Sequence, residues 1–231
     1  MKKISRLINT SILAICSFST ANATVLINEI DYDQEGTDTA EFIELFNSGS
    51  STANLDSYRL DLINGTSTTE PPAVKHSFDL TGYSLTAGSY FVICGNASMV
   101  INCDIDTGIS RNMIQNGSAD GIALYNGSDL IDAVTYEGVI TDITEGSQGT
   151  LADTGSGIFS IGRLLGSQDT NDNAADFERG CITPGSANIS GTGDCSALAA
   201  ATGAVSLPSI MWLFGSGLIG IAASLKEKET L

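Results

Sequence analysis

The sequence predicts an all-β domain built as a β-sandwich, followed by one C-terminal transmembrane helix. Eight short segments with β-type patterns follow one another, and clusters of Gly, Asn, Ser and Asp separate them. No long amphipathic helical pattern occurs between residues 24 and 206. The last apolar stretch of the 231-residue chain, residues 207–225, contains no charged residue.

The predicted strands are short, and turn-forming residues bound each of them. They are residues 25–33, 41–47, 58–63, 74–80, 90–94, 121–125, 130–136 and 158–164. In the second strand Ile43 and Glu44 face opposite sides, because side chains alternate along a strand. The segment 122–134 is the clearest hairpin. Its Asn126-Gly127 pair suits a type I′ turn, in which both central residues have positive φ.

The C-terminal segment 207–225 has the length of a membrane span. At ~1.5 Å per residue it covers roughly 28 Å, close to the ~30 Å hydrocarbon core of a bilayer. A lone segment in lipid must be a helix, because its backbone groups need internal partners. Lys226 and Lys228 follow it and place the tail 226–231 in the cytoplasm. A buried core helix is the alternative. Residues 191–206, which precede the segment 207–225, are predicted to form a flexible linker.

The N-terminal segment 1–23 has the pattern of a secretory signal peptide. Lys2, Lys3 and Arg6 form its basic n-region, and residues 7–18 form its apolar h-region. Ala21 and Ala23 form the small-residue cleavage site. The mature chain is then predicted to begin at Thr24. Lipidation at Cys16 is the alternative, although Ile15 replaces the small residue expected before the Cys.

The exported part, residues 24–206, is strongly acidic. The chain has 10 Lys and Arg and 27 Asp and Glu; five basic and two acidic residues lie in the two ends, which leaves −20 for the exported part. Such a surface disfavours nucleic-acid binding and attracts cations, above all Ca²⁺ outside the cell. The length suits one domain, residues 24–190, with a hydrophobic core.

Four cysteines remain in the exported part, and an even number in an oxidising compartment predicts two disulfides. Three pairings are possible. We favour Cys94–Cys103 and Cys181–Cys195, because each closes a short loop rich in turn-forming residues. A zinc site is the rival, but the sequence contains no C-x₂-C pair and only one His.

Several segments in order carry a resemblance to a known family. These are VLINEIDYD, TAEFIELFNSGSSTANLDSYRL, LTAGSYFVIC, GIALYNGSDLIDAVTYEG and SIGRLLGSQDTNDNAADFERGCITPGSAN. Together they resemble the lamin tail domain family as found in bacteria, over residues 24–189. The resemblance implies an immunoglobulin-like β-sandwich. It also implies an accessory module of surface or secreted proteins, which in relatives sometimes stands beside nuclease or phosphatase domains. The final Arg163, an acidic loop at 169–176 and a Thr-Pro-Gly ending at 183–185 belong to this resemblance.

The segment LPSIMWLFGSGLIGIA, which begins at Leu207 and Pro208, resembles PEP-CTERM sorting tails of the type that reads VPLP before the apolar stretch. Here Ser206 stands where that type has Pro, and Lys and Glu alternate in the tail. The resemblance implies an exosortase-like processing enzyme as a partner. A processed chain would be released or attached at the cell surface. An unprocessed chain would stay in the inner membrane, with its domain outside the cytoplasm.

The sequence does not predict an enzyme. His76 is the only His and falls in a predicted strand, where a solvated or hydrogen-bonded role is commoner than catalysis. No G-x-S-x-G, P-loop or H-E-x-x-H motif is present. Glu29, Glu41 and Glu44 are candidates for a glycosidase-like carboxylate pair. Glu41 and Glu44 point to opposite faces of one strand, so we expect outward-facing or hydrogen-bonded carboxylates instead.

A cation site is the better hypothesis for the acidic loop. Asp169, Asn171 and Asn173 match the D-x-[DN]-x-[DN] opening of a calcium loop, and Asp176 offers another carboxylate. The EF-hand pattern then ends, since Ala174 replaces the turn Gly. A solvated loop without a metal is the alternative. A second acidic run, formed by Asp31, Asp33, Glu35 and Asp38, is a further candidate.

These observations predict an exported, non-catalytic module of the cell envelope or surface. Its binding surface would be presented to an envelope protein or an extracellular polysaccharide, and the membrane would be a partner through the C-terminal helix. One alternative is an accessory module or remnant of a secreted nuclease or phosphatase with metal-dependent activity. The other is a purely structural matrix component.

Overall fold

The computed structural model describes residues 24–66, 71–155, 158–164, 168–191 and 195. The predicted signal peptide, the sorting residues Leu207 and Pro208, the membrane segment and the tail lie outside the described residues, as do the cleavage residues Ala21 and Ala23. Among the helices that are described, none is long and apolar enough to cross a membrane.

The larger sheet has seven strands in the order β13-β12-β11-β1-β2-β7-β8. Neighbouring strands are antiparallel except for β7 and β8, which are parallel. The strand bounds, in chain order, are β1 (Val25–Asp31), β2 (Phe42–Asn47), β7 (Tyr90–Cys94), β8 (Cys103–Asp106), β11 (Phe159–Arg163), β12 (Phe177–Cys181) and β13 (Ile189–Ser190).

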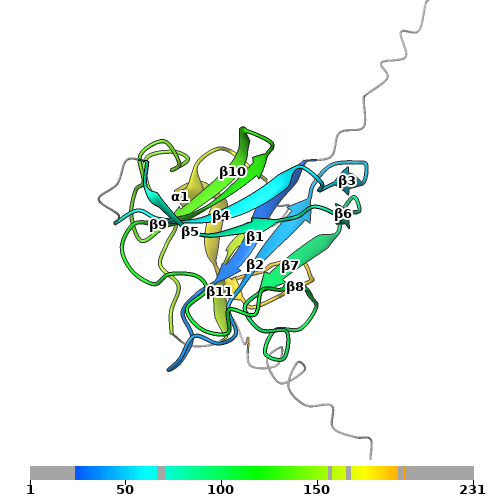
Figure 1. Ribbon diagram of the computed structural model, residues 1–231. Helices are drawn as coiled ribbons and strands as arrows, with labels where there is room; N and C mark the ends of the chain where they lie inside the picture. Colours follow the sequence, from blue (N-terminus) through cyan, green and yellow to red (C-terminus); the bar gives the residue numbers. More distant parts are fainter. Residues whose placement is uncertain (1–23, 67–70, 156–157, 165–167, 192–194, 196–231) are drawn as a thin grey trace, which may run out of the picture.

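The second layer is a four-stranded antiparallel sheet in the order β10-β9-β4-β5 (Figure 1). Its strands are β4 (Tyr58–Asn64), β5 (Ala73–Asp79), β9 (Asp120–Asn126) and β10 (Asp129–Tyr136). A small third sheet joins β3 (Ala53–Asn54) to β6 (Ser84–Leu85). The short helix α1 (Asn173–Asp176) precedes β12.

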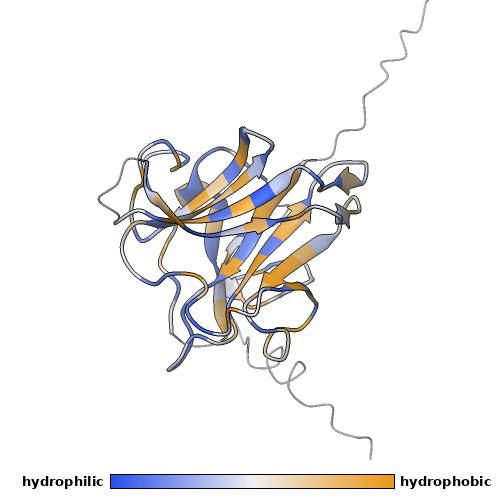
Figure 2. Ribbon diagram, in the orientation of Figure 1, coloured by the Kyte–Doolittle hydropathy of each residue, from blue (hydrophilic) through white to orange (hydrophobic). Residues whose placement is uncertain are grey.

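The hydrophobic core lies between the two large sheets and confirms the all-β sandwich prediction. Apolar side chains of both layers share one buried cluster, among them Ile30, Leu45, Leu60, Leu124 and Ile161. Figure 2 shows apolar and polar residues alternating along the strands of both layers. Burial of one such Leu or Ile side chain contributes about 1.5–3 kcal/mol, so this cluster supplies the main driving force for folding.

All eight predicted strands are present, with ends that differ by at most two residues. The structure adds five strands to them within the described residues: β3, β6, β8, β12 and β13. Three of these, β3, β6 and β13, have two residues each and are too short to show a pattern. β12 was missed because FERGC has two adjacent charged residues, Glu178 and Arg179, followed by Gly180, and so lacks the apolar alternation of a strand.

The predicted turn of the 122–134 hairpin is wrong by one residue. Asn126 pairs with Asp129, so the two central residues are Gly127 and Ser128. Of these two, only Gly127 has positive φ, at 61°. Glycine at the first central position is typical of a type II′ turn, which has the twist that a two-residue hairpin needs.

Both favoured disulfides are present. Cys94–Cys103 joins β7 to β8 with a Cα–Cα distance of 5.8 Å, and Cys181–Cys195 has a Cα–Cα distance of 5.3 Å. Each closes a short loop and contributes roughly 3 kcal/mol by restricting the unfolded chain.

Candidate functional site

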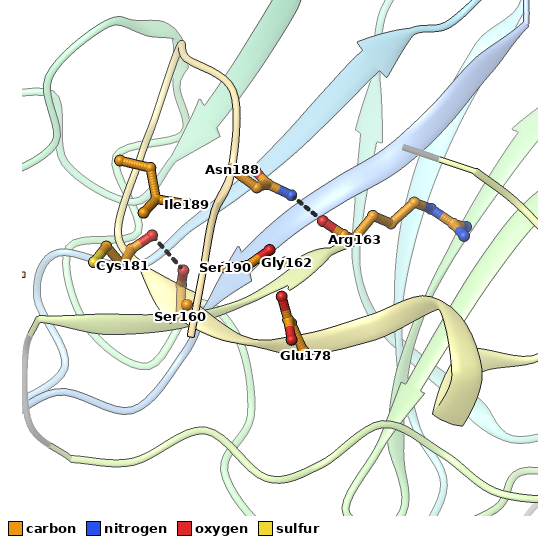
Figure 3. Close-up of a pocket in the computed structure, with 9 residues that line it drawn as sticks. Ser160, Gly162, Arg163, Glu178, Cys181, Asn188, Ile189 and Ser190 are labelled. Atoms are coloured by element: carbon orange, nitrogen blue, oxygen red, sulfur yellow. Dashed lines mark hydrogen bonds between the residues drawn. The ribbon is translucent and has the colours of Figure 1, made fainter. Parts of the chain in front are cut away.

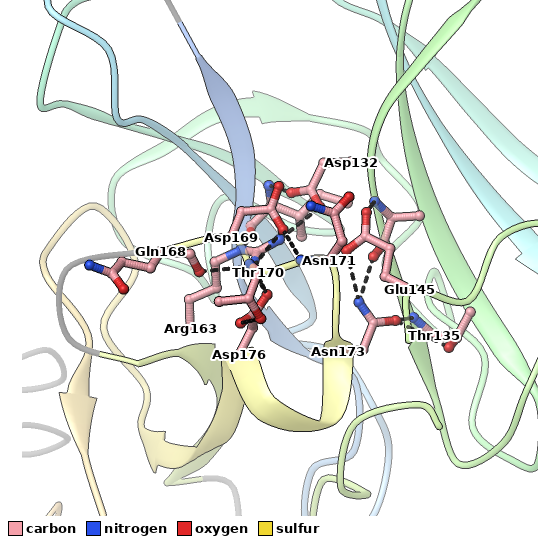
Figure 4. A network of polar contacts seen from close by, with 12 residues as sticks. Asp132, Thr135, Glu145, Arg163, Gln168, Asp169, Thr170, Asn171, Asn173 and Asp176 are labelled. Carbon is pink, nitrogen blue, oxygen red and sulfur yellow. Dashed lines mark hydrogen bonds and ion pairs between the residues drawn. The ribbon is translucent and has the colours of Figure 1, made fainter. Parts of the chain in front are cut away.

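Arg163 lies buried at the end of β11, between the two sheets, and its guanidinium contacts several groups at once (Figure 4). Nη2 donates to Asp132 Oδ1 of β10 at 2.7 Å. Nη1 donates to Asp176 Oδ2 at 3.0 Å and to the carbonyl of Gln168 at 3.2 Å. The guanidinium carbon lies 4.5 Å from the ring centroid of Phe177. One cation therefore joins β11, β10 and the acidic loop before β12.

The same centre satisfies backbone groups that the sheet leaves unpaired. The β1–β11 ladder includes Glu29 and Ile30, and β1 has a bulge between Ile27 and Glu29. The N–H of Ile27 donates to Asp132 Oδ2 at 2.6 Å, and its carbonyl accepts from Arg163 Nε at 2.8 Å. Ile27 lies beyond the two β1–β11 register pairs, so the side chains of Asp132 and Arg163 take the place of a β11 backbone partner.

Asp132 reaches this centre because β10 also has a bulge. The register shifts between Leu130 and Asp132, which places Asp132 opposite Leu124, a core residue. Without the extra residue, Ile131 would face inward and Asp132 would face solvent. Burial raises the pKa of Asp132, and the charge of Arg163 opposes that rise.

Asn173 fastens helix α1 to β10. Its Oδ1 accepts from the N–H of Thr135 at 3.0 Å, and its Nδ2 donates to the carbonyl of Ala133 at 2.8 Å. Nδ2 also donates to Glu145 Oε2 at 3.2 Å. Because the side chain is fully buried, these contacts fix the position of the acidic loop.

The structure separates the four predicted calcium ligands. Asp169 and Asp176 both lie near Arg163: its Nη1 is 3.7 Å from Asp169 Oδ1 and 3.0 Å from Asp176 Oδ2. Asp176 also accepts from the backbone N–H and the hydroxyl of Thr170, at 2.8 and 2.6 Å. Asn173 is turned toward β10, and Asn171 is exposed. Calcium binding by this set stays a prediction.

A different carboxylate group comes together beside Arg163. Ligand atoms of Asp132, Glu145 and Asp169 all lie within 4.8 Å of one another. Burial raises the pKa of Glu145 to about 7, and the charges of Asp132 and Asp169 add to the rise. The three oxygens have the chemistry to hold a hard cation. The sequence did not point to Asp132 or Glu145, because chain segments far apart supply them.

A second buried carboxylate centre lies on the outer face of the seven-stranded sheet. Glu29 of β1 and Glu44 of β2 are direct cross-strand partners, and both are buried. Residues 182–190, here called the C-terminal strap, contact both glutamates. Figure 3 shows the part of the strap at Asn188, Ile189 and Ser190 near β11. The prediction that these glutamates are hydrogen-bonded is confirmed.

The strap satisfies both carboxylates mainly through its backbone. Glu29 accepts from the N–H and the hydroxyl of Thr183, at 2.8 and 2.7 Å, and from the Ser160 hydroxyl at 2.6 Å. Glu44 accepts from the N–H of Gly185 at 2.6 Å and from Asn28 Nδ2 at 2.7 Å. Burial raises the pKa of Glu29 to about 7 and that of Glu44 to about 9. The Thr-Pro-Gly ending is therefore a structural clamp.

Asn188 anchors the far end of the strap. Its Nδ2 donates to the carbonyls of Asn28 and Arg163 at 3.1 and 2.9 Å, and its Oδ1 accepts from Asn28 Nδ2 at 2.9 Å. Figure 3 shows Asn188 beside β11 together with the small cavity under the strap. That cavity has about 10 Å³, room for at most one water molecule.

The remaining predicted candidates also hold the fold together. Glu41 accepts from the backbone N–H groups of Met113 and Ile114, at 2.7 and 3.0 Å, and burial raises its pKa to about 7. His76 stacks on Phe78 with ring centroids 6.2 Å apart. Neither arrangement resembles a nucleophile with its base.

The second acidic run is divided by the structure. Asp31 is buried, and burial together with the Asp153 charge raises its pKa. Asp38 closes a turn by accepting from the N–H of Gln34 at 2.9 Å. Glu35 is exposed. Of these residues, Asp38 builds the turn after β1.

Comparison with known proteins agrees with this architecture. A family model described as Lamin Tail Domain matches residues 19–138. The chain belongs to the lamin tail domain family. Arg163, the acidic loop and the strap lie beyond the matched residues of this lamin tail domain protein. No curated protein matches the chain.

Among solved structures, a DUF4876 family protein from Bacteroides thetaiotaomicron is similar, with a TM-score of 0.45 and 14% sequence identity. The alignment covers 67% of this chain and 70% of that chain. Independently of this likeness, the two disulfides of the lamin tail domain protein are typical of an extracellular or envelope-exposed protein, because the cytosol keeps thiols reduced.

Proposed function

We propose that this lamin tail domain protein is an exported, non-catalytic module of the cell envelope or surface. It presents a binding surface to an envelope protein or an extracellular polysaccharide. An exosortase-like enzyme processes its C-terminal segment at Leu207 and Pro208, or the segment stays in the membrane and anchors the domain. Its net charge of −20 over residues 24–206 repels phosphate backbones, so nucleic acids are not among the proposed partners.

One observation carries the non-catalytic part of the proposal. The buried carboxylates that sequence reasoning offered as catalytic groups use their oxygens on donors of the same chain. Glu29 and Glu44 hold the strap, and Glu41 holds the loop at Met113 and Ile114. A carboxylate that is saturated by internal donors is poorly placed to move a proton on a substrate. Ligand chemistry therefore belongs to the exposed strand faces and loops.

A specific observation favours one rival function. The carboxylates of Asp132, Glu145 and Asp169 lie close enough to hold a metal, which suits metal-dependent hydrolysis by an accessory module of a nuclease or phosphatase. Arg163 lies among them and supplies a competing positive charge. The proposal of a binding module predicts no turnover at this cluster.

Binding and hydrolysis are tested on the same purified full-length chain in detergent micelles. Interferometry against purified envelope polysaccharide and fractionated envelope proteins should give saturable binding to one of them. Incubation with DNA and with phosphate esters in Ca²⁺, Mg²⁺ or Mn²⁺ should give no turnover above the chelated control. Turnover that Asp169→Asn abolishes and Asp104→Asn leaves intact would replace the proposal with the hydrolase. No saturable binding and no turnover would leave a structural matrix component.

Processing is tested by mass spectrometry of the chain from its own cells. We expect a mature N-terminus at Thr24, and a C-terminus near Pro208 if processing occurs. Recovery of the full-length product from the cytosol with four reduced thiols would contradict export.

A further inference from the structure

After β12 the chain makes a closed excursion and returns to the strand that it left. β12 ends at Cys181, the C-terminal strap crosses the outer face of the sheet, and β13 pairs back with β12. The disulfide then joins Cys195 to Cys181 across a sequence separation of 14. Cys195 is buried, so the described chain ends against the sheet, directly beside the last residue of β12.

Two mechanical paths therefore lead from Cys195 into the sheet. The covalent path runs through the disulfide to Cys181 and reaches β12, which has five register pairs with β11. The second path follows the chain backward through β13, which has only two register pairs with β12. It then reaches the strap contacts at Asn188, Gly185 and Thr183.

The two paths resist a pull very differently. Along the backbone path the hydrogen bonds of β13 and the strap are loaded one after another, and each contributes only about 0.5–1.5 kcal/mol net. Along the disulfide path the load enters at Cys181, the last residue of β12, which is held to β11 by five register pairs. β12 lies inside the seven-stranded sheet, and Arg163 at the end of its neighbour β11 ties that strand to the second sheet.

Loss of the strap would also harm the domain itself. Thr183 and Gly185 supply backbone donors to the buried Glu29 and Glu44. A buried carboxylate that loses its donors carries an uncompensated desolvation cost. The strap therefore has to be kept in place under any load that the domain carries.

We infer that the Cys181–Cys195 disulfide is a mechanical clip, which passes a pull from the C-terminal side of the chain into β12 and keeps the strap out of the path of the force. The inference rests on the proposed function, in which residues after Cys195 hold the domain at the envelope. The mechanical property itself needs no binding partner, so a mechanical measurement is independent of the binding tests.

The test is single-molecule pulling of the full-length chain in detergent micelles, with handles at its two ends. In the oxidised chain the domain should unfold without an early step. In the double variant Cys181→Ser with Cys195→Ser, an extra low-force extension should precede unfolding. Each extended residue adds about 3.3–3.6 Å, so release of the loop adds roughly 4 nm.

The matched control removes the other disulfide. Cys94→Ser with Cys103→Ser opens the loop between β7 and β8. That loop touches the strap through Asn102, whose Nδ2 donates to the carbonyl of Pro184 at 2.8 Å, but the Cys181–Cys195 path stays closed, so no early step should appear. The same control chain is then reduced while folded in the trap, which opens only Cys181–Cys195 and should produce the early step. This second measurement keeps the inference testable if the first double variant does not fold. Unfolding in one event at unchanged force, with Cys181–Cys195 open, would overturn the inference.

Discussion

The Arg163 centre and the Glu29–Glu44 centre bury carboxylates in two different ways. At the first, one guanidinium lies 2.7 Å from Asp132 and 3.0 Å from Asp176, so a fixed cation offsets the negative charge. At the second, two glutamates face each other across β1 and β2, and their donors are neutral N–H and O–H groups. Burial raises the pKa of Glu44 to about 9, and the charge of Glu29 adds to the rise.

The difference shows what each centre requires. An ion pair inside a protein depends on both partners, because a buried charge without its counterion is strongly destabilising. Where two carboxyls face each other without a cation, stability depends on protonation instead. Like charges directly opposite each other destabilise a sheet, and a bound proton removes one of them. The first centre should therefore be sensitive to mutation of its cation, and the second to pH.

Removal of the cation should have the largest effect. Arg163→Met leaves Asp132 and Asp176 buried without a counterion and leaves the carbonyl of Ile27 without its donor. We expect a loss of about 3–5 kcal/mol in the free energy of unfolding, measured by urea titration. Arg59→Met is the matched control, since the Arg59 side chain is largely exposed and its partner Asp61 keeps the Ser77 hydroxyl as a donor, so the loss should be about 1 kcal/mol. Equal losses in the two variants would contradict the ion-pair account.

Per pH unit, the pH dependence should come next in size, because up to two extra protons are bound. In the folded state Glu29 and Glu44 hold their protons up to about pH 7 and 9, whereas both ordinarily lose them near 4.5. The folded state binds more protons than the unfolded state in this window, so the free energy of unfolding should fall as pH rises from 5 to 9. Each extra proton contributes about 1.4 kcal/mol per pH unit. Urea titrations across this range measure the slope.

Glu44→Gln tests whether the pH dependence comes from the Glu29–Glu44 centre. The variant cannot ionise, so its stability should fall less steeply than that of the natural chain between pH 7 and 9. Glu35→Gln, at an exposed position, should keep the natural slope. A natural chain whose stability rises from pH 5 to 9 would contradict the protonated pair.

The anchor of helix α1 should have a smaller effect. Asn173→Ala leaves the N–H of Thr135 and the carbonyl of Ala133 without their partner, and should cost about 2–3 kcal/mol by thermal or urea unfolding. Asn171→Gly is the control, because Asn171 is exposed with φ of 57°, a conformation that glycine adopts freely. A control that loses as much as Asn173→Ala would show that the loop is held by another contact.

Calcium should give the smallest effect. Oxygens of Asp132, Glu145 and Asp169 lie together, but Asp132 already accepts from Ile27 and Arg163. We expect millimolar Ca²⁺ to stabilise the chain by about 1 kcal/mol or less, seen as a small rise in Tm. Asp169→Asn should remove the rise. A rise that survives in this variant would place the cation elsewhere.

Strand order along the chain could be predicted from sequence, because alternation and turn residues are local properties. The two centres could not be predicted, because both depend on bulges. Without the bulge in β1, Asn28 would face Glu44, and the bulge moves Glu29 into that place. A bulge inserts one residue without leaving a clear sequence signal, yet it reverses the face of every following side chain.

The candidate site was predicted only in part for a related reason. Asp169 and Asp176 were found because they lie in one acidic loop, and Arg163 through the family resemblance. Asp132 and Glu145 come from other segments and meet them only through the packing of the two sheets. The strap contacts of Glu29 and Glu44 likewise join residues more than 140 positions apart.

Titration of the glutamate side-chain carboxyl carbons by NMR tests the contrast between the two centres most directly. The account predicts that Glu44 titrates near pH 9 and Glu29 near pH 7, with the strap in place. Titration of both residues near the ordinary value of 4.5 in the folded chain would contradict it.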